Sequence, residues 1–212
     1  MILAELGKPE YVYFEEINDG ILNVIPAVRS TDKKKALDVG CGAGLLGQAI
    51  EKRGYAVWGI ESNAEAADRA ASRITRVIRE DLTNTDAVRA KIGSEIFDTL
   101  IFSDILEHVY DPFAVLVKYL EFLKPGGSVA VSVPNALVWT NRLNFLFGRF
   151  EYEDSGVMDK THIRFFTFKT AKKLVEATGC RVVKVSHTPY FVRAFLPLMK
   201  KALIKRSEGV AP

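Results

Sequence analysis

Hydrophobic and polar residues follow two different periods along this chain, and the two periods alternate. Short apolar runs bounded by turn residues predict buried strands at residues 36–39, 56–61, 75–79, 97–102 and 128–133. After several of these runs, apolar residues recur every three or four positions, which predicts helices from about residues 45, 64 and 113. This order of strands and helices indicates an α/β fold with a doubly wound, mostly parallel sheet and helices on both faces.

The two ends of the chain carry weaker patterns. Apolar residues at mixed spacing within residues 9–29 predict one or two helices before the first strand. Thr167 is placed to cap a helix that Gly179 ends, and residues 181–187 have the pattern of a strand. A further strand has only a weak candidate at residues 190–195, between two prolines.

Length and composition are those of one ordinary globular unit. The chain has 212 residues, of which 48% are hydrophobic, and it contains no low-complexity tract or internal repeat. Its two cysteines make no disulfide framework. No apolar run approaches the roughly 18 residues of a membrane span. A cytoplasmic location is therefore expected.

The stretch from Leu37 to Gly47 has the pattern of a buried strand that stops at alternate glycines and restarts at once as a helix. Gly40, Gly42 and Gly44 permit positive φ and close backbone approach, and N–H groups at the helix start face the loop. A dinucleotide-binding loop places its third glycine one position later, where this chain has Leu45. The loop therefore predicts a ligand other than a dinucleotide.

Two acidic residues refine the expected ligand. Asp38 lies two residues before Gly40, where it would repel a pyrophosphate and attract an ammonium group. Glu61 ends the second predicted strand, where an acid can accept hydrogen bonds from both ribose hydroxyls of a nucleoside. An amino-acid-bearing nucleoside fits both charges. Ser62 or Asn63 is expected to cap the next helix.

A second dense motif, from Ser103 to Pro112, follows the fourth predicted strand. In a doubly wound sheet, residues after the first and fourth strands face a common crevice, so this motif is expected beside the glycine loop. His108 is the favoured acid/base candidate, because a neutral imidazole can accept a proton near neutral pH. His162 and Asp104 are the alternatives. Glu107 and His108 would equally suit packing against the next helix.

The pattern changes after the fifth predicted strand, where residues 135–166 are polar and rich in aromatic side chains. A lid on the ligand side of a sheet can bind a substrate and exclude water. Trp139 and Arg164 are candidate substrate contacts, with Arg164 placed to clamp an anion, and His162 is a second candidate base. The same aromatics would also pack over the sheet in a purely structural role, with Asp159 paired to Arg164.

Four motifs within residues 36–134 resemble those of class I S-adenosylmethionine-dependent methyltransferases, particularly small-molecule enzymes similar to the ubiquinone O-methyltransferases. They are the glycine loop, the acid that ends the second strand, Leu-Glu-His-Val followed by Asp-Pro, and the Leu-Lys-Pro-Gly-Gly turn. The resemblance implies a Rossmann-like fold, S-adenosylmethionine as cofactor, and Asp81 and Leu82 against the adenine, with Glu80 the alternative to Asp81. The expected cofactor contacts are Asp38, Gly40, Cys41, Gly42, Gly44, Glu61, Ser62, Asp81, Leu82 and Ser103.

Other parts of the chain resemble this group less specifically. Some ubiquinone-pathway relatives use the Glu-His pair in metal or substrate contacts. On this resemblance, Glu107 is expected to contact the substrate. No resident metal is expected. The run from Asp159 to Thr167 resembles a subgroup linked to cell-envelope sugar or lipid pathways. The expected layout is one methyltransferase domain in four parts. A helical cover is expected at residues 1–35, a cofactor-binding core at 36–134, a substrate lid at 135–166, and a C-terminal helix, strand and tail at 167–212.

The function expected is methyl transfer to an oxygen or nitrogen of a small molecule, sugar or lipid. The net charge of +3 is too small to indicate nucleic acid, and residues 103–106 lack the Asn/Asp-Pro-Pro-Tyr/Phe run of amino-methylating nucleic-acid enzymes. The glycine spacing and Asp38 disfavour a nicotinamide oxidoreductase. The alternative is a cofactor-binding but inactive scaffold that docks on a membrane or partner through a basic, amphipathic tail containing Lys200, Lys201, Lys205 and Arg206.

Overall fold

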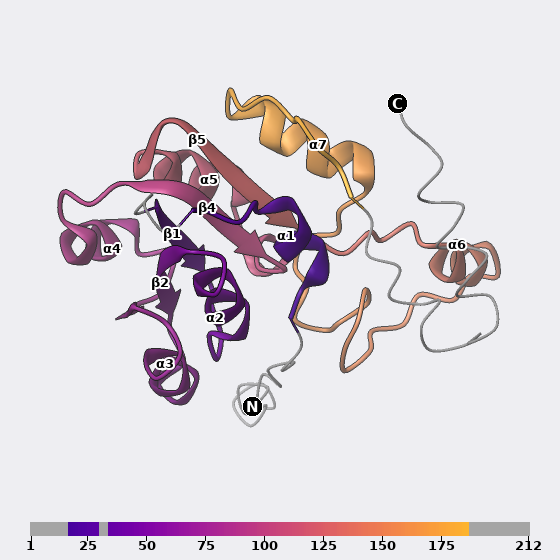
Figure 1. Cartoon of the computed structure of the whole chain (residues 1–212). Helices are drawn as coiled ribbons and strands as arrows, with labels where there is room; N and C mark the ends of the chain where they lie inside the picture. Colours follow the sequence, from indigo (N-terminus) through magenta and orange to yellow (C-terminus); the bar gives the residue numbers. More distant parts are fainter. Residues whose placement is uncertain (1–16, 30–33, 187–212) are drawn as a thin grey trace.

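A computed structural model describes residues 17–29 and 34–186, and a parallel sheet organises the described part of the chain (Figure 1). The strands are β1 (Lys34–Val39), β2 (Tyr55–Glu61), β3 (Arg76–Arg79), β4 (Phe97–Ser103) and β5 (Leu123–Ser132). They lie in the order β3-β2-β1-β4-β5, and every neighbouring pair is parallel. The doubly wound sheet predicted from the sequence is confirmed. Its strand order reverses between β1 and β4, which places the expected ligand crevice at their carboxyl ends.

Helices cover both faces of the sheet, as predicted (Figure 1). One face carries α4, α5 and α7, and the opposite face carries α1, α2 and α3. The bounds are α1 (Asp19–Val24), α2 (Leu45–Glu51), α3 (Ala64–Ala71), α4 (Thr85–Ile92), α5 (Pro112–Leu120), α6 (Trp139–Leu146) and α7 (Phe168–Ala177). A single turn of 3-10 helix, η1 (Leu106–His108), lies between β4 and α5.

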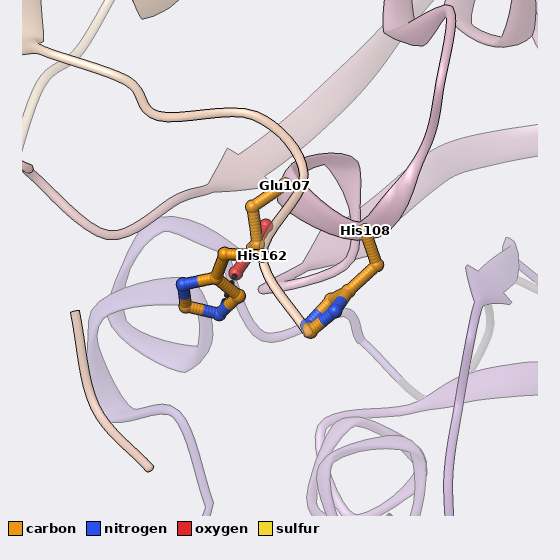
Figure 2. A group of neighbouring side chains, drawn as sticks. All are labelled: Glu107, His108 and His162. Carbon is orange, nitrogen blue, oxygen red and sulfur yellow. Dashed lines mark ion pairs between the residues drawn. The ribbon is translucent and has the colours of Figure 1, made fainter. Parts of the chain in front are cut away.

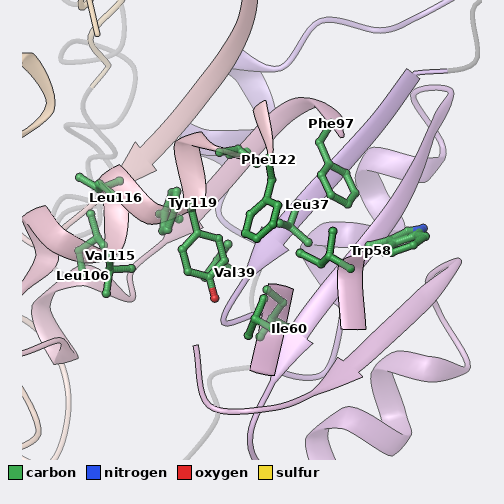
Figure 3. Close-up of a cluster of buried hydrophobic side chains, with 14 of the residues drawn as sticks. Leu37, Val39, Trp58, Ile60, Phe97, Leu106, Val115, Leu116, Tyr119 and Phe122 are labelled. Atoms are coloured by element: carbon green, nitrogen blue, oxygen red, sulfur yellow. The ribbon is translucent and has the colours of Figure 1, made fainter. Parts of the chain in front are cut away.

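Alternation along the strands sends side chains into two cores. Leu37 and Val39 of β1 face the core under α5, whereas Ala36 faces the core under α2. Figure 3 shows the first of these cores, with Tyr119 of α5 among the β-sheet side chains. Phe102 and Tyr119 are fully buried and pack edge to face, with ring centroids 5.7 Å apart. Because burial of each such side chain stabilises by about 1.5–3 kcal/mol, this core holds the carboxyl ends of β1 and β4 in place.

Side-chain caps explain where several helices begin. The side chains of Asn63, Asn84, Asp111 and Thr167 each accept a backbone N–H in the first turn of α3, α4, α5 and α7. Of the two candidates Ser62 and Asn63, Asn63 is the cap. The predicted cap at Thr167 is present, and the Thr170 hydroxyl accepts a bond from the Thr167 N–H in return.

Two elements within the sheet region differ from the sequence analysis. Helix α4 was not foreseen, because its buried residues are only Val88 and Ile92 and its apolar stripe is short. Residues 124–127, expected as a turn before the fifth strand, lie within β5. Since Leu123 pairs with Phe97 and Ser128 with Thr99, these four residues bulge out of an otherwise continuous ladder.

The strand predicted at residues 181–187 is wrong for its described part, because residues 181–186 form no strand. Val183 and Val185 are 80% and 47% exposed, and no described strand pairs with this segment. Strands gain their backbone hydrogen bonds only from neighbours, so alternation alone does not produce one. His187, the candidate strand at 190–195 and the basic residues at 200–206 lie outside the described residues.

The insertion predicted after the fifth strand is present. The chain leaves β5, passes through α6 and returns to α7, extending beyond the arrowhead of β5 (Figure 1). The ends of this segment meet where Asn135 bridges Phe166, and the Ala136 N–H donates to the Phe166 carbonyl at 2.7 Å. Its function as a lid stays a prediction. Among the described residues, no helix combines the length and apolar character needed to cross a membrane.

Candidate functional site

The glycine loop between β1 and α2 has the conformation that its sequence predicts. Gly40, Gly42 and Gly44 have φ values of 76°, 52° and 79°, which side-chain-bearing residues rarely adopt. Space is also restricted. A Cβ on Gly44 would lie 3.0 Å from the backbone of Ala70, and one on Gly40 would lie 2.7 Å from Ile105. The glycines therefore let β1 turn directly into α2 while α3 and the chain after β4 pack against the turn.

Glu61, the acid at the end of β2, binds this loop through its carboxylate. Its two carboxylate oxygens accept the Gly42 N–H at 2.9 Å and the Asn63 N–H at 2.8 Å. The side chain is 6% exposed, and Ser62 beside it is exposed. Glu61 thus links the glycine loop to the start of α3. Its expected contact with ribose, and that of Ser62 with the cofactor, stay predictions.

Asp38 lies at the carboxyl end of β1, and its carboxyl group is buried without a partner. The residue is 1% exposed, and neither oxygen accepts a hydrogen bond within the described chain. Burial, with the nearby Glu61 charge adding to it, raises the pKa of Asp38 to about 7. Burial and these two acids also raise the pKa of the Cys41 thiol, so Cys41 is a neutral packing residue rather than a nucleophile.

An orphaned buried carboxylate is costly unless it binds a proton or a cationic donor. Asp38 therefore fits the ammonium group of an amino-acid-bearing ligand, as its place before the glycines predicted.

Asp81 and Glu80, the two candidates for the predicted adenine contact, have different partners in the turn after β3. Glu80 forms an ion pair with Lys91 at 2.9 Å, and the Asn84 amide also donates to it. Asp81 is exposed, and its bonds within the described chain, from the N–H and hydroxyl of Thr83, both use Oδ1. Oδ2 of Asp81 is thus the better acceptor for an exocyclic amine. Leu82 is partly buried against the core, so its predicted contact with an adenine ring would use its exposed edge.

The chain turns sharply where it leaves β4. Asp104 has a φ of 50°, the one positive value outside glycine among the described residues. Asn18, the N-cap of α1, reaches this corner from the far end of the described chain. Its amide donates to Asp104 Oδ2 at 2.7 Å, Ser132 Oγ at 3.0 Å and Ser103 Oγ at 3.3 Å. The sequence analysis missed Asn18. An Asn-Asp pair before an apolar run signals an N-cap, but contacts across 85 or more residues leave no local pattern.

Beyond this corner, the structure brings Glu107, His108 and His162 together (Figure 2). Ligand-type atoms of the three side chains all lie within 4.8 Å of one another. His162 Nε2 is 3.9 Å from Glu107 Oε1, and the two imidazole rings meet edge to face with centroids 4.8 Å apart. The structure therefore places both predicted bases, from η1 and from the segment after α6, at one point.

Main-chain bonds hold His162 in this position. The Glu107 carbonyl accepts the N–H groups of both Ile163 and Arg164 at 3.0 Å. The Arg164 guanidinium donates to the Tyr110 carbonyl and lies 5.1 Å from the centroid of the Tyr110 ring. Arg164 therefore helps to fasten residues 161–164 to the chain after η1, and its predicted contact with an anionic substrate stays a prediction. The pairing of Asp159 with Arg164, which belonged to the purely structural alternative, is not seen, and Asp159 instead accepts from the N–H and hydroxyl of Thr161.

Hydrogen bonds to carbonyl oxygens define the tautomers of the two histidines. His108 Nδ1 lies 3.2 Å from the Thr161 carbonyl, and His162 Nδ1 lies 3.1 Å from the Val157 carbonyl. A carbonyl only accepts, so each Nδ1 carries a proton and each neutral ring has Nε2 as its basic atom. Burial, with the neighbouring His162, lowers the pKa of His108. His108 is therefore neutral and able to accept a proton at pH 7.

Glu107 is the most buried member of the cluster. It is 1% exposed, and neither carboxyl oxygen has a hydrogen-bond partner among the described residues. Burial, with the charges of Asp104 and Asp159, raises its pKa well above the ordinary value. One carboxylate and two imidazoles whose Nδ1 atoms bond to carbonyls are also a donor set that could hold a divalent cation. The expectation of no resident metal stays a prediction, as does contact of Glu107 with a substrate.

Exposed aromatic side chains continue from this cluster along the inserted segment. Phe165 lies 6.5 Å from His162 and 6.3 Å from Phe150, measured between ring centroids. Phe150 stacks on Phe145 at 5.4 Å and is 57% exposed, as is Tyr152. Trp139 on α6 is 66% exposed, and its contact with a substrate stays a prediction. The aromatics thus form a partly exposed apolar surface that ends at the histidines.

Comparison with known proteins identifies sequence relatives. A family model described as a methyltransferase domain matches residues 11–185. The ubiquinone biosynthesis O-methyltransferase of Aliivibrio fischeri (strain MJ11) is 33% identical over 129 residues, which cover 59% of this chain and 55% of that protein. The chain thus spans about half the length of the curated relatives it matches.

Solved structures share the fold at lower identity. A SAM-dependent methyltransferase from Aquifex aeolicus is 16% identical with a TM-score of 0.57, over 81% of this chain and 84% of that one. A plantazolicin methyltransferase solved with S-adenosylhomocysteine is 19% identical with a TM-score of 0.52, over 84% and 72% of the two chains.

Proposed function

The chain belongs to the family of methyltransferase domains, and on that premise we propose that it transfers a methyl group from S-adenosylmethionine to an oxygen or nitrogen of a small molecule, sugar or lipid. One observation carries the proposal. The orphaned carboxyl of Asp38, under the glycine loop, and the cluster of Glu107, His108 and His162 follow adjacent parallel strands, β1 and β4. A binding site for a cationic donor and a proton acceptor thus share one edge of the sheet.

The residues present fit S-adenosylmethionine. Asp38 would accept the ammonium group, Glu61 the ribose hydroxyls and Asp81 the adenine amine, while the glycines permit close approach of the ligand to the backbone. When bound, the cofactor supplies an electrophilic methyl group on a good leaving group. Catalysis then requires chiefly proximity, in-line orientation and exclusion of water.

Within this proposal, His108 removes the proton of a hydroxyl acceptor. Its Nε2 is the basic atom, and the lowered pKa keeps the ring neutral at pH 7. His162 is the second candidate, and the Glu107 carboxyl 3.9 Å from its Nε2 orients that ring. Asp104 is the third candidate base. The aromatic surface beside His162 suits an acceptor with a ring or apolar chain. The name of the curated relative, a ubiquinone biosynthesis enzyme, agrees with such an acceptor.

The first experiment tests cofactor binding without any need for an acceptor. Calorimetric titration with S-adenosylmethionine and S-adenosylhomocysteine is expected to give micromolar dissociation constants, roughly −8 kcal/mol. Asp38→Asn should weaken binding by at least about tenfold, because a charged hydrogen bond contributes about 1.5–3 kcal/mol. Asp68→Asn is the matched control, since Asp68 is an exposed carboxylate on α3 paired with Arg79. A folded protein that binds neither ligand would contradict the proposal and favour the inactive scaffold.

The second experiment tests turnover. Release of S-adenosylhomocysteine is measured with phenolic, lipid and sugar hydroxyl acceptors, with and without a chelator. Turnover that survives chelation supports proton removal by His108. Loss on chelation that added Mg²⁺ or Zn²⁺ reverses would assign the cluster to a cation instead. We also propose a cytoplasmic location, which the two free cysteines support.

A further inference from the structure

Asn18 connects elements that are distant in sequence. Its Oδ1 accepts the Ile21 N–H at 3.1 Å, as the cap of α1, while its Nδ2 points toward the carboxyl ends of β4 and β5. There it donates to Asp104 Oδ2 at 2.7 Å and Ser132 Oγ at 3.0 Å, with Ser103 Oγ at 3.3 Å. One side chain therefore joins the start of α1 to the ends of two adjacent strands.

The chemistry of these partners permits only one orientation of the amide. The oxygen must face the Ile21 N–H, and the nitrogen must face the Asp104 carboxylate, because a flipped amide would bring two acceptors together. The bond to Asp104 is short and charge-assisted. Asn18 thus suits a corner that contains a carboxylate. Its amide offers both an oxygen that accepts the Ile21 N–H and a nitrogen that donates to Asp104, which no other uncharged cap residue provides.

Asp104 is held from two sides in a conformation that side-chain-bearing residues rarely adopt. Its φ is 50°, and its N–H donates to the Ser132 carbonyl at 3.2 Å and to Ser132 Oγ at 3.1 Å. Asn18 holds the opposite end of the residue, the carboxylate. Immediately after this corner the chain enters η1, which carries Glu107 and His108. The direction in which these two side chains point follows from the backbone at Asp104.

We propose that Asn18 is a positioning residue, which holds Asp104 in its left-handed conformation and so aims η1, with Glu107 and His108, toward the crevice. It acts through Asp104 and does not itself contact the reacting atoms. The consequence for turnover rests on the proposed function. The consequence for the conformation of Asp104 does not.

The substitution Asn18→Ser separates the two tasks of this residue. Serine caps a helix about as well as asparagine, but it lacks the amide that reaches Asp104. NMR chemical shifts and couplings of Asp104 are expected to report positive φ in the wild type and its loss in Asn18→Ser, with the amide signals of Glu107 and His108 shifted. Asn84→Ser, the same change at the cap of α4, should leave these signals in place. Positive φ that persists in Asn18→Ser would overturn the proposal.

A reciprocal exchange tests the pairing itself. Asn18→Asp places two carboxylates face to face and is expected to lower the melting temperature and disrupt the Asp104 signals. The second change Asp104→Asn turns the pair around, with the new amide donating to the new carboxylate and both residues still compatible with their backbone. The double variant should recover most of the lost melting temperature. If the two changes simply add, the contact is incidental.

A kinetic measurement separates positioning from simple stability. For an acceptor that is turned over, Asn18→Ser is expected to lower kcat about tenfold, with little change in KM for the cofactor. Equal losses in cofactor affinity and kcat would mean that α1 merely supports the fold, which contradicts the proposal. If the folded protein binds neither S-adenosylmethionine nor S-adenosylhomocysteine but the NMR and exchange results hold, the proposed function fails while the role of Asn18 stands.

Discussion

Two buried carboxyl groups, Asp38 and Glu107, follow adjacent strands of the same sheet and have different surroundings. Both are 1% exposed, and neither has a hydrogen-bond partner for its oxygens among the described residues. Asp38 has another acid, Glu61, as its charged neighbour. Glu107 has His162 at 3.9 Å and His108 in the same cluster. The carboxyl of Asp38 therefore depends on a proton or a ligand from outside. Glu107, in contrast, has two imidazoles of the chain beside it, together with the charges of Asp104 and Asp159.

We interpret this difference as a division between a site for cofactor binding at Asp38 and a site for proton transfer at the histidine cluster. A site that must attract a cationic ligand gains from a carboxylate whose only cation is that ligand, since the unfavourable burial is relieved on binding. A site that must handle protons gains from imidazoles placed beside a carboxyl, because an imidazole can both accept and donate a proton. We therefore expect changes at Asp38 to affect cofactor affinity and changes in the histidine cluster to affect turnover.

The largest effect is expected at the cluster. His108→Ala should lower kcat for a hydroxyl acceptor about 10²–10⁴-fold, because it removes a general base. Affinity for S-adenosylhomocysteine should be unchanged. His162→Ala should cost less. In the wild type, kcat should rise with pH and level off before about pH 7. The reason is that the neutral form of His108 is the active one and burial lowers the pKa of this residue. Intact turnover in His108→Ala would show that His108 is not the base.

The next effect concerns Asp38 and pH in the unliganded protein. Its folded pKa is raised from 3.8 to about 7, so the folded state holds a proton that the unfolded state releases. The free energy of unfolding should therefore fall as pH rises from about 4 to 7, by up to about 4 kcal/mol relative to Asp38→Asn. Urea unfolding of both proteins at several pH values measures this difference. Parallel pH profiles would show that Asp38 is already ionised and paired.

A smaller effect, on the free energy of unfolding, is expected from Gly44→Ala in the glycine loop. The positive φ of 79° and the 3.0 Å approach to the Ala70 backbone both oppose a Cβ, and we expect a loss of about 2–3 kcal/mol in unfolding free energy. Cofactor affinity should fall with it. Gly179→Ala is the matched control, because Gly179 has a φ of 88° but open space where a Cβ would be. Equal losses in the two variants would mean that backbone conformation, rather than close packing, requires Gly44.

The smallest effect is expected from Glu107→Gln. The amide resembles the protonated carboxyl, so unfolding free energy at pH 5 should change by less than about 1 kcal/mol. Since burial raises the pKa of Glu107, the wild type should lose stability relative to the variant as pH rises above about 4.5. Denaturation at pH 5 and pH 8 measures the difference. If the variant is instead less stable at both values, Glu107 is ionised and held by a cation or an imidazolium, and the contrast with Asp38 disappears.

The sequence predicts the glycine loop with Asp38 and Glu61 better than it predicts the cluster of Glu107, His108 and His162. The glycine loop, Asp38 and Glu61 lie within 24 consecutive residues, and local rules on strand ends, positive φ and charge were enough to assign them. The doubly wound parallel sheet and the family are likewise confirmed, since strand and helix periods are local signals.

The cluster required the fold. His108 and His162 are 54 positions apart, and they meet because hydrogen bonds join residues 161–164 to residues 107–110. Asn18 lies further still from Asp104, and the failed strand at 181–186 shows that alternation without a partner predicts little. Contacts of this kind depend on how loops end, which leaves no periodic trace in the sequence.

The bridge between Asn135 and Phe166 has a consequence for how such a domain can diversify. The inserted segment leaves and rejoins the sheet at one place, and its further bonds to residues 107–110 come from residues 161–164. The part before these residues can therefore lengthen, shorten or be exchanged without altering strand register. The free-energy cost of closing a loop, which comes from lost chain entropy, rises by only about 0.6 kcal/mol for each doubling of the loop's length. A lineage could thus acquire a new acceptor by replacing residues 136–156 while inheriting the glycine loop, the sheet and the histidine cluster unchanged.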